Sequence, residues 1–320
     1  DPRGRNARGR GAALGGGRWQ PYADPGAARR EAQDLARAMT LKAALAGLPQ
    51  GGGKAVVIGD PQARTREQLL AFGRFVETLR GAYITAADMG TGEEQMAVIR
   101  EATAHVVGFP EALGGCGSPA PHTALGVFLA IESALEHIGL RLRGASVVIQ
   151  GAGQVGSRLA VRLVEAGAEV AVAEPDTRSL ARLRSEVPAV REVAPADALA
   201  TPCDVFAPCG PPGVIRSAEL ACRIVCGAAN NPLAERAVAT AHARRGLLYV
   251  PDFIANGGGV VYLWEAHARA AQPDAPADFS KLSSERLRVI PGNLRQILEV
   301  AEAEGILPLE VAERRALESV

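Results

Sequence analysis

The sequence lacks the patterns that mark several large classes of protein. Its apolar runs stay well short of the roughly 20 residues that a membrane-spanning helix needs, and no secretory signal pattern stands at its start. Its 35 Lys and Arg are balanced by 35 Asp and Glu, so the basic excess typical of nucleic-acid binders is missing. We therefore expect a cytoplasmic protein that binds neither membranes nor nucleic acids.

The sequence also lacks the spacings of metal sites and disulfide frameworks. Its five cysteines form no Cys-x-x-Cys pair, and its five histidines form no His-Glu-x-x-His motif. An odd number of cysteines is typical of reduced thiols inside a cytoplasmic protein. We expect no metal centre, and we find no internal repeat of fixed period.

The clearest signal that is present is a glycine-rich turn between a predicted strand and a predicted helix. Ala145–Gln150 is an apolar run of strand character, and Gly151–Gly156 follows it with the pattern G-x-G-x-x-G. Ser157–Ala166 then has apolar residues at helical spacing, and a second predicted strand, Ala168–Ala173, ends at Glu174. Strand, turn, helix, strand and acid in this order are typical of a dinucleotide-binding unit.

Each part of this unit has a physical reason. The first glycine permits a tight turn, the second lets the backbone approach a pyrophosphate, and the third lets the helix pack on the strand. An acid at the end of the second strand can accept both ribose hydroxyls and repels a 2′-phosphate, which favours NAD over NADP. Asp176 is the rival acid, and a plain glycine turn is the alternative for the motif. The cofactor-binding residues expected here are Gly151, Gly153, Gln154, Val155, Gly156 and Glu174.

The rest of the chain alternates strand-like and helical segments. This alternation predicts an α/β fold with a doubly wound parallel sheet, preceded by a separate α/β domain. Thr91 with Glu94 predicts a capping box at the start of one helix. The other expected elements are strands at 55–58, 82–85, 204–207, 223–226 and 247–250, and helices at 31–45, 66–79, 294–302 and 309–317.

Two lysines and an aspartate stand in unusual settings in the N-terminal region. Lys42 closes Met39-Thr40-Leu41-Lys42, and Lys54 joins three glycines to an apolar strand. A lysine entering a buried strand is costly unless it has a partner or a lowered pKa, and a second ammonium nearby lowers that pKa further. Lys54 is then a candidate general base and Lys42 a candidate holder of a substrate carboxylate; a surface lysine at a loop-to-strand junction is the alternative. Asp88 follows a predicted strand and is either a site carboxylate or a turn former.

With these motifs the sequence resembles the branched-chain and aromatic amino-acid dehydrogenases, that is, the leucine, valine and phenylalanine dehydrogenases related to glutamate dehydrogenase. The resemblance runs from about Ala12 to Ala316. It implies an N-terminal α/β substrate domain, a Rossmann-type NAD-binding domain and a cleft between them. Its landmarks are Ala13–Gly16, Met39–Lys42, Gly51–Lys54 through Pro61, Thr85–Thr91, Gly151–Gly156, Ala207–Cys209, Ala228–Asn231 and Pro251–Val260.

The resemblance implies domains at 1–122 and 123–263, with helices in 264–320 completing the first domain. It also implies a homo-oligomer, dimer or higher. Members of the family usually have some tens of residues before the Leu-Gly-Gly segment, so we expect that this chain lacks a piece of the subunit interface. Twelve of the 36 glycines fall at 15–17, 51–53, 151–156 and 257–259, and we expect each cluster to border the cleft.

The resemblance further implies roles for matching positions. Lys54 would activate water, Asp88 would exchange protons with the substrate amine, and Lys42 would bind the α-carboxylate, helped by the backbone near Gly15 and Gly16. Asn231 would lie beside the substrate. The side-chain pocket would be lined by Leu14, Met39, Ala86, Val260 and Leu263, and further cofactor contacts would come from Thr123, Asn230 and Asn256.

The implied reaction is the reversible oxidative deamination of a small apolar L-amino acid to the 2-oxo acid and ammonia. Hydride would pass from the substrate Cα to NAD, and neutral Lys54 would deprotonate the water that attacks the resulting iminium. Leu263 replaces a smaller pocket residue, which favours Val, Leu and Ile over the alternative, Phe or another aromatic side chain. Two residues depart from the family: Ala87 stands where leucine dehydrogenases often carry Glu, and His122 where a small or apolar residue is common.

Two rival functions are weighed against this one. A 2-hydroxy acid or polyol dehydrogenase would need a His or Tyr acid/base, and none of His105, His122 and His242 stands in such a setting. An inactive or truncated NAD-binding homologue is the other rival. Retention of Lys42, Lys54 and Asp88 discriminates an active enzyme from this rival, and all three residues are present.

Overall fold

The computed structural model describes residues 11–217, 219–270 and 285–319, and it divides the chain into two compact units. The described part of the first unit covers 11–119, 260–270 and 315–319. The second unit covers the rest, including 285–314.

One expected domain assignment is corrected by this division. Residues 285–314 belong to the second unit and do not complete the first. The reason is packing, because α11 (Val289–Glu304) lies along α4 (Ala120–His137) and also contacts α8 (Asp252–Ala255). Leu294, Ile297 and Leu298 of α11 are buried.

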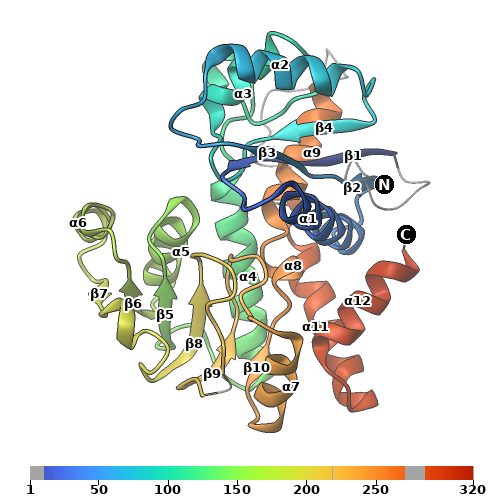
Figure 1. Ribbon diagram of the computed structural model, residues 1–320. Helices are drawn as coiled ribbons and strands as arrows, with labels where there is room; N and C mark the ends of the chain where they lie inside the picture. Colours follow the sequence, from blue (N-terminus) through green and yellow to red (C-terminus); the bar gives the residue numbers. More distant parts are fainter. Residues whose placement is uncertain (1–10, 218, 271–284, 320) are drawn as a thin grey trace. The chain divides into compact units, whose positions relative to one another are not determined.

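The first unit is a parallel four-stranded sheet with helices on both faces. The central strand is β1, with β2 and β3 along one side and β4 along the other. α1 covers one face, and α2 and α3 cover the other (Figure 1). In chain order the elements are β1 (Gly11–Gln20), α1 (Pro25–Leu45), β2 (Gln50–Gly52), β3 (Ala55–Ile58), α2 (Arg66–Glu77), β4 (Tyr83–Ala86), α3 (Glu93–Arg100) and a short 3-10 turn at Glu111–Leu113; most of α9 (Gly258–Ala270) belongs to this unit as well.

The strand β1 is one of the elements that the sequence pattern did not predict. It contains three consecutive glycines, which disfavour an isolated strand. It forms because it is hydrogen-bonded on both sides. β2 and β3 continue one register along it, with Leu14 opposite Gly52 and Gly17 opposite Ala55. On its other side, Gly16 lies opposite Ala86 of β4.

Helix starts in the first unit follow local capping. α2 begins as predicted at Arg66, where Thr65 accepts from the backbone N of Gln68 and Gln68 accepts from that of Thr65. The predicted Thr91–Glu94 capping box is wrong. α3 begins one residue later than that box requires, because Gln95 accepts from Gly92 N at 2.8 Å, and Thr91 is engaged with Asp88 instead.

The second unit confirms the predicted doubly wound parallel sheet. Its six strands lie in the order β7-β6-β5-β8-β9-β10, all parallel, so the chain switches from one side of β5 to the other at β8. This is the strand order of a dinucleotide-binding fold. The elements are α4, β5 (Ser146–Gln150), α5 (Gln154–Glu165), β6 (Glu169–Ala173), α6 (Thr177–Glu186), β7 (Arg191–Glu192), a 3-10 turn at Pro195–Asp197, β8 (Cys203–Pro208), β9 (Cys222–Val225), α7 (Arg236–Arg244), β10 (Leu248–Tyr249), α8, α11 and most of α12 (Pro308–Glu318).

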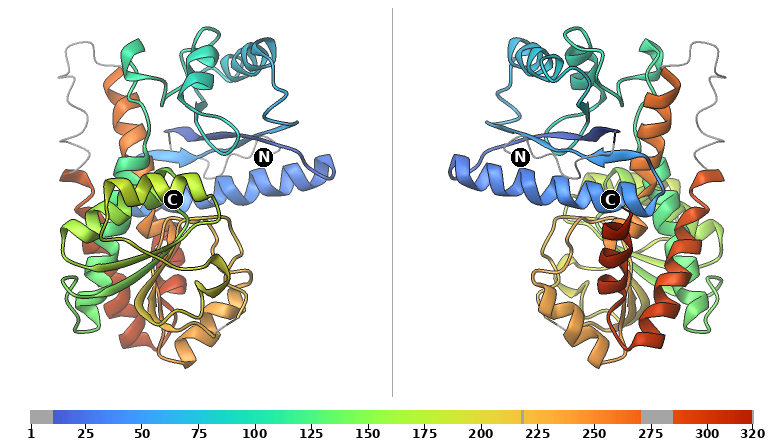
Figure 2. Two further views of the ribbon diagram at one scale, coloured as in Figure 1. Left: turned by 90° about the vertical axis from the view of Figure 1, so that its left-hand side faces the viewer. Right: turned by 90° about the vertical axis from the view of Figure 1, so that its right-hand side faces the viewer.

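The core of the second unit explains why its strands read as unbroken apolar runs. Val147, Val148 and Ile149 are all buried, although successive side chains of a strand point to opposite faces. Both faces of the sheet are therefore covered, as parallel sheets require. The helices of this unit are seen from two more sides in Figure 2.

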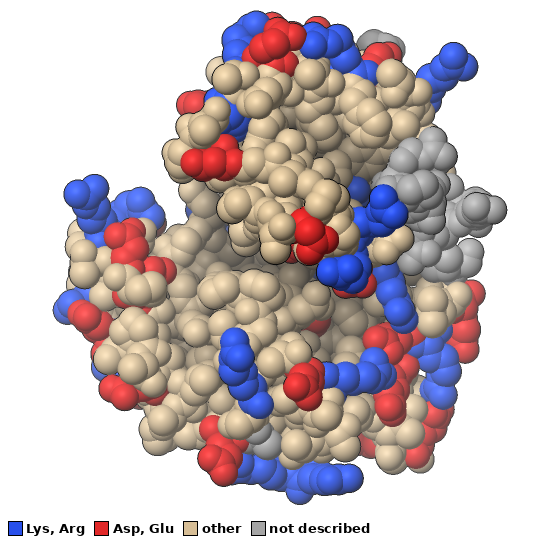
Figure 3. Space-filling view, in the orientation of Figure 1, with Lys and Arg blue, Asp and Glu red and all other residues tan. Residues whose placement is uncertain are grey.

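The surface agrees with the balanced composition. On the face shown in Figure 3, basic and acidic side chains are intermingled. Among the described residues, no helix is both long enough and apolar enough to cross a bilayer.

Candidate active site

Lys54 lies at the break between β2 and β3. The register that pairs Leu14 with Gly52 continues through the break, which sets Gly53 beside Gly15 and Lys54 beside Gly16. Gly53 N still donates to Leu14 O at 3.1 Å. The break between β2 and β3 thus contains Lys54, which is the only basic residue between Gln50 and Ile58. Lys54 is only 6% exposed.

Asp88 reaches the same point from the other side of β1. It lies two residues beyond β4, and its Oδ2 forms an ion pair with Lys54 Nζ. A Cβ placed on Gly16 would lie 2.7 Å from this same Oδ2. The bare backbone of β1 therefore leaves the space in which the two side chains meet.

The other oxygen of Asp88 is also engaged. Its Oδ1 accepts from Arg18 Nε at 3.1 Å and from Met89 N at 2.6 Å. Thr91 Oγ1 accepts from Asp88 N at 2.9 Å and lies 2.9 Å from Gly17 O, to which it donates. These contacts hold the carboxylate against β1 in one orientation.

The electrostatics of Lys54 favour its neutral form. Burial lowers the pKa of Lys54 well below its usual range, and Arg18 and Lys42 lower it further, while Glu31 raises it. The ion pair with Asp88 acts in the opposite direction and favours the charged form. A lysine whose pKa is lowered can act as a general base.

Lys42 is brought to the site by the last turns of α1. Thr40 of the same turn donates to Ala36 O at 3.0 Å and accepts from Gly52 N at 3.2 Å, which joins α1 to β2. Lys42 is 7% exposed and close enough to Lys54 to lower its pKa. The chain thus brings together the three charged residues that the sequence singled out.

The expected pocket residues fall into two groups. Leu14 and Ala86 are buried on the paired strands β1 and β4, beside Gly16, and Met39 is half-buried on α1. Val260 and Leu263 are buried on α9, where the Leu263 side chain packs beside Gly108. Asn231 belongs to the second unit, where its backbone N donates to Asp252 at 2.9 Å, so its position beside the substrate stays a prediction.

Two residues of this site were missed by sequence reasoning, Arg18 and Glu31. Arg18 is buried on β1 and contacts both Asp88 and Glu31. Glu31 lies on α1 and also accepts from Gln20 Nε2 at 3.0 Å. The signal available for Arg18 was a charged residue directly after the glycines of an otherwise apolar segment.

The dinucleotide turn has the geometry that its three glycines predict. Gly151 has φ +101°, which L-residues rarely adopt. A Cβ on Gly156 would lie 1.9 Å from Gly151 O, so the start of α5 packs directly on the turn. A Cβ on Gly153 would meet nothing within 4 Å, so this residue faces open space. The turn therefore fits a pyrophosphate at Gly153 and the N-terminus of α5.

Glu174 is tied to that turn, and its rival is not. Glu174 accepts from Ala152 N at 2.6 Å and from Asp176 N at 2.8 Å. Asp176 instead caps α6 by accepting from the backbone and the hydroxyl of Ser179. Glu174 is thus the acid that lies beside the turn, where a ribose would follow the pyrophosphate.

The other expected cofactor residues gather at the same edge of the sheet. Asn256 Nδ2 donates to Ala228 O at 3.0 Å and to Asn230 Oδ1 at 3.1 Å. A Cβ on Gly258 would lie 2.1 Å from His122 O, so the first turn of α4, which carries Thr123, packs closely on the segment that follows Asn256. Gln154 and Val155 open α5 at the turn itself.

Three glycines of the clusters at 15–17 and 51–53 lie against other segments of the chain. A Cβ on Gly15 would lie 1.7 Å from Gly53 O, one on Gly52 would lie 2.2 Å from Thr40 N, and one on Gly53 would lie 2.7 Å from the Tyr83 ring. These glycines are required by close contacts between chain segments. Only Gly153 of the positions discussed here opens onto free space.

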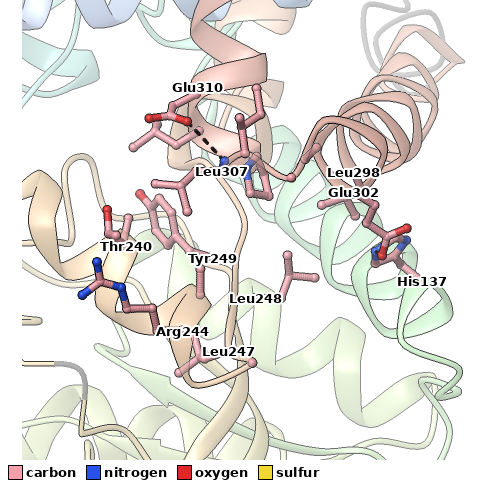
Figure 4. Close-up of a pocket in the computed structure, with 18 of the residues that line it drawn as sticks. His137, Thr240, Arg244, Leu247, Leu248, Tyr249, Leu298, Glu302, Leu307 and Glu310 are labelled. Carbon is pink, nitrogen blue, oxygen red and sulfur yellow. Dashed lines mark hydrogen bonds and ion pairs between the residues drawn. The ribbon is translucent and has the colours of Figure 1, made fainter.

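A cavity of about 680 Å³ lies elsewhere in the second unit (Figure 4). It is formed by α4, α7, β10, α11 and the start of α12, with His137 and Glu302 in an ion pair of 2.9 Å at one end and Tyr249 and Leu307 inside. None of the residues predicted for the site lines it.

Family models match most of the chain, from residue 3 to residue 269. The model of the Glu/Leu/Phe/Val dehydrogenase dimerisation domain matches residues 3–105. The model of the glutamate/leucine/phenylalanine/valine dehydrogenases matches residues 114–180 and 170–269. The resemblance stated from the sequence motifs is thereby confirmed.

Individual relatives agree with the family models. A valine dehydrogenase of Streptomyces virginiae is 38% identical over 314 residues, which cover 96% of this chain and 86% of that protein. A leucine dehydrogenase of Bacillus subtilis is 35% identical over 316 residues, covering 97% and 84%. The crystal structure of an L-tryptophan dehydrogenase from Nostoc punctiforme aligns with a TM-score of 0.77 at 33% identity, over 96% of this chain and 87% of that one. The chain therefore belongs to the Glu/Leu/Phe/Val dehydrogenase family and is an oxidoreductase that acts on the CH–NH₂ group of amino acids.

Proposed function

We propose that this enzyme catalyses the reversible, NAD-dependent oxidative deamination of branched-chain L-amino acids to 2-oxo acids and ammonia. The observation that carries this proposal is the buried Lys54–Asp88 pair, with Lys42 beside it. It combines a lysine that favours its neutral form, a carboxylate within reach of it, and a second cation for the substrate carboxylate.

Lys54 and Asp88 divide the proton transfers between them. Neutral Lys54 takes a proton from the water that attacks the substrate imine carbon, and the lowered pKa of Lys54 favours the neutral form that this step needs. Asp88 exchanges a proton with the substrate amine, and the protonated nitrogen leaves as ammonia when its bond to the Cα breaks. Lys42 holds the α-carboxylate and so fixes the Cα for both steps.

The cofactor site is proposed at the glycine turn and Glu174. Gly153 leaves room for the pyrophosphate, and Gly151 and Gly156 shape the turn around it. Glu174 is proposed to accept the ribose hydroxyls, and Thr123, Asn230 and Asn256 are proposed to contact the nicotinamide part of the cofactor. NAD, when bound, supplies the acceptor for the hydride of the substrate Cα.

The substrate preference rests on the proposed pocket. Leu14, Ala86, Val260 and Leu263 are apolar and buried, which suits an aliphatic side chain. Aromatic amino acids are the second candidate, because a relative of similar identity is an L-tryptophan dehydrogenase. One methylene is worth only about 1–3 kcal/mol in such a pocket, so several substrates are expected to react.

Assembly and location complete the proposal. The family model that matches residues 3–105 is named a dimerisation domain, which supports a homo-oligomer of two or more copies. Reduced thiols at all five cysteines suit a cytoplasmic enzyme.

A panel assay tests the proposed reaction. Purified protein is given NAD and each of Val, Leu, Ile, Phe, Trp and Glu, and NADH formation is followed, with NADP in place of NAD as the control. The highest kcat/KM is expected with the branched-chain amino acids and NAD. If a folded protein formed no NADH with any amino acid of the panel, the proposed reaction would be refuted. A preference for Phe or Trp would change the proposed substrates from branched-chain to aromatic amino acids.

Cofactor choice depends on Glu174. In Glu174→Ala, the loss of a charged acceptor worth about 1.5–3 kcal/mol should raise the KM for NAD by about 10- to 100-fold and reduce the discrimination against NADP. The matched control is Asp176→Ala, which should cost stability at the start of α6 and leave cofactor preference unchanged. Steady-state kinetics with both cofactors measure this. If only Asp176→Ala shifted the preference, Asp176 would be the ribose acid.

A further inference from the structure

Arg18 connects the proposed proton-transfer pair to a second carboxylate. Its Nε donates to Asp88 Oδ1 at 3.1 Å, and its Nη1 is ion-paired with Glu31 Oε1. The Arg18 side chain is 9% exposed, and the guanidinium is planar, so its two donors point in directions that are fixed relative to each other. Holding one end by Glu31 therefore fixes the orientation of the other end at Asp88.

Glu31 is in turn held by its own neighbours. Its second oxygen accepts from Gln20 Nε2 at 3.0 Å, and Gln20 is the last residue of β1. α1 supplies the carboxylate and β1 supplies both the amide and the guanidinium. A chain of contacts thus runs from Gln20 through Glu31 and Arg18 to Asp88 and ends on Lys54.

We propose that Arg18 and Glu31 are positioning residues for the reaction: Arg18 turns Asp88 so that one carboxylate oxygen faces Lys54, and Glu31 holds Arg18 in place. This inference rests on the proposed function, since it assigns the two residues to the same proton transfers. Neither residue needs to touch the substrate, and each acts through Asp88 and Lys54.

The charges that face Lys54 come from three elements and act in both directions. Arg18 on β1 and Lys42 on α1 lower the pKa of Lys54, and Glu31 on α1 raises it. Asp88, after β4, forms the ion pair. Tyr22 stays neutral, because burial first and then Glu31 raise its pKa. Removing Arg18 or Glu31 should therefore move the titration of Lys54 in opposite directions, which loss of packing alone would not do.

The composition of the chain makes this titration directly observable. Of its 35 Lys and Arg residues only Lys42, Lys54 and Lys281 are lysines. The protein labelled with ¹³C at lysine Cε should give three side-chain signals in NMR spectra, assigned with Lys42→Arg and Lys281→Arg. The pH midpoint of the Lys54 signal then reports its protonation without any need for catalysis.

Three variants separate charge from positioning. Arg18→Gln should raise the Lys54 midpoint and Glu31→Gln should lower it. Arg18→Lys keeps the positive charge but loses the planar guanidinium that donates to Asp88 and Glu31 at once. The Lys54 midpoint of this variant should therefore stay closer to that of the unmodified protein. Its kcat should fall by about 10²-fold, and its KM for the amino acid should change little. The control is Arg66→Gln, which removes an exposed ion pair with Glu101 in the same unit and should change neither quantity.

The outcomes are separable. Midpoints that do not move, or that move in the same direction in Arg18→Gln and Glu31→Gln, would overturn the inference, as would an unchanged kcat in Arg18→Lys. If Arg18→Gln does not fold, Arg18→Lys and Glu31→Gln carry the test. An unmodified protein that oxidises no amino acid would remove the proposed function, while opposite midpoint shifts would still establish the effect on Lys54.

Discussion

Lys54→Ala should abolish amino-acid oxidation while leaving NAD binding intact. The variant removes the only base proposed for activating water, and general base catalysis typically contributes about 10²- to 10⁴-fold. Lys54 lies in the first unit and the glycine turn in the second, so the cofactor site keeps all of its proposed residues. The measurement is kcat with the best amino acid of the panel, together with the Kd for NAD by calorimetry.

Lys54→Arg distinguishes a role of Lys54 as a proton acceptor from a role of its positive charge alone. Arginine keeps a cation beside Asp88 but does not lose its proton in proteins, so this variant should be as inactive as Lys54→Ala. Arg66→Ala, which removes an exposed cation of the same unit, should keep full activity. Activity within a few-fold of the unmodified enzyme in Lys54→Arg would show that Lys54 acts only through its charge.

Gly15→Ala should destabilise the first unit strongly. A Cβ at this position would lie 1.7 Å from Gly53 O and 2.7 Å from Gly53 C, and both are backbone atoms that cannot rotate away. The same residue also accepts from the Tyr83 hydroxyl at 2.7 Å, so β1 cannot shift without breaking that bond. Overpacking a core costs about 1–3 kcal/mol and occasionally more, and we expect the upper end or beyond.

Gly11→Ala is the matched control on the same strand. Its Cβ would lie 3.6 Å from Pro49 O, an ordinary contact, so the change in unfolding free energy should stay within about 0.5 kcal/mol. Thermal unfolding of the three proteins compares them, with about 2–4 °C expected for each kcal/mol in a domain of this size. Equal melting temperatures for the two variants would contradict the close packing of β1 against Gly53.

The dinucleotide unit could be predicted because each of its signals is local. The strand at Ser146–Gln150, the turn and the helix α5 follow one another along the chain, and Glu174 closes the next strand. The strand β1 gave no such signal. Its glycines are poor strand formers, and its three partner strands lie in residues 50–58 and 83–86, which no local pattern connects to it.

The glycine clusters show the same division. For Gly151, Gly153 and Gly156 the spacing predicted three distinct roles, and the turn shows a positive φ, open space and a close helix contact in that order. For Gly15 and Gly16 the expected neighbour was a ligand. The neighbours found are Gly53 and Asp88, brought there by pairing across the sheet.

The sequence by itself determined the fold class, the family and the candidate residues Lys42, Lys54 and Asp88, because these follow from residue type and spacing along the chain. Only the tertiary structure decided how they meet. Lys54 and Asp88 are 34 residues apart and come into contact because both flank β1 at Gly16. It also added Arg18 and Glu31, whose part in the site depends on contacts that form only in the folded chain.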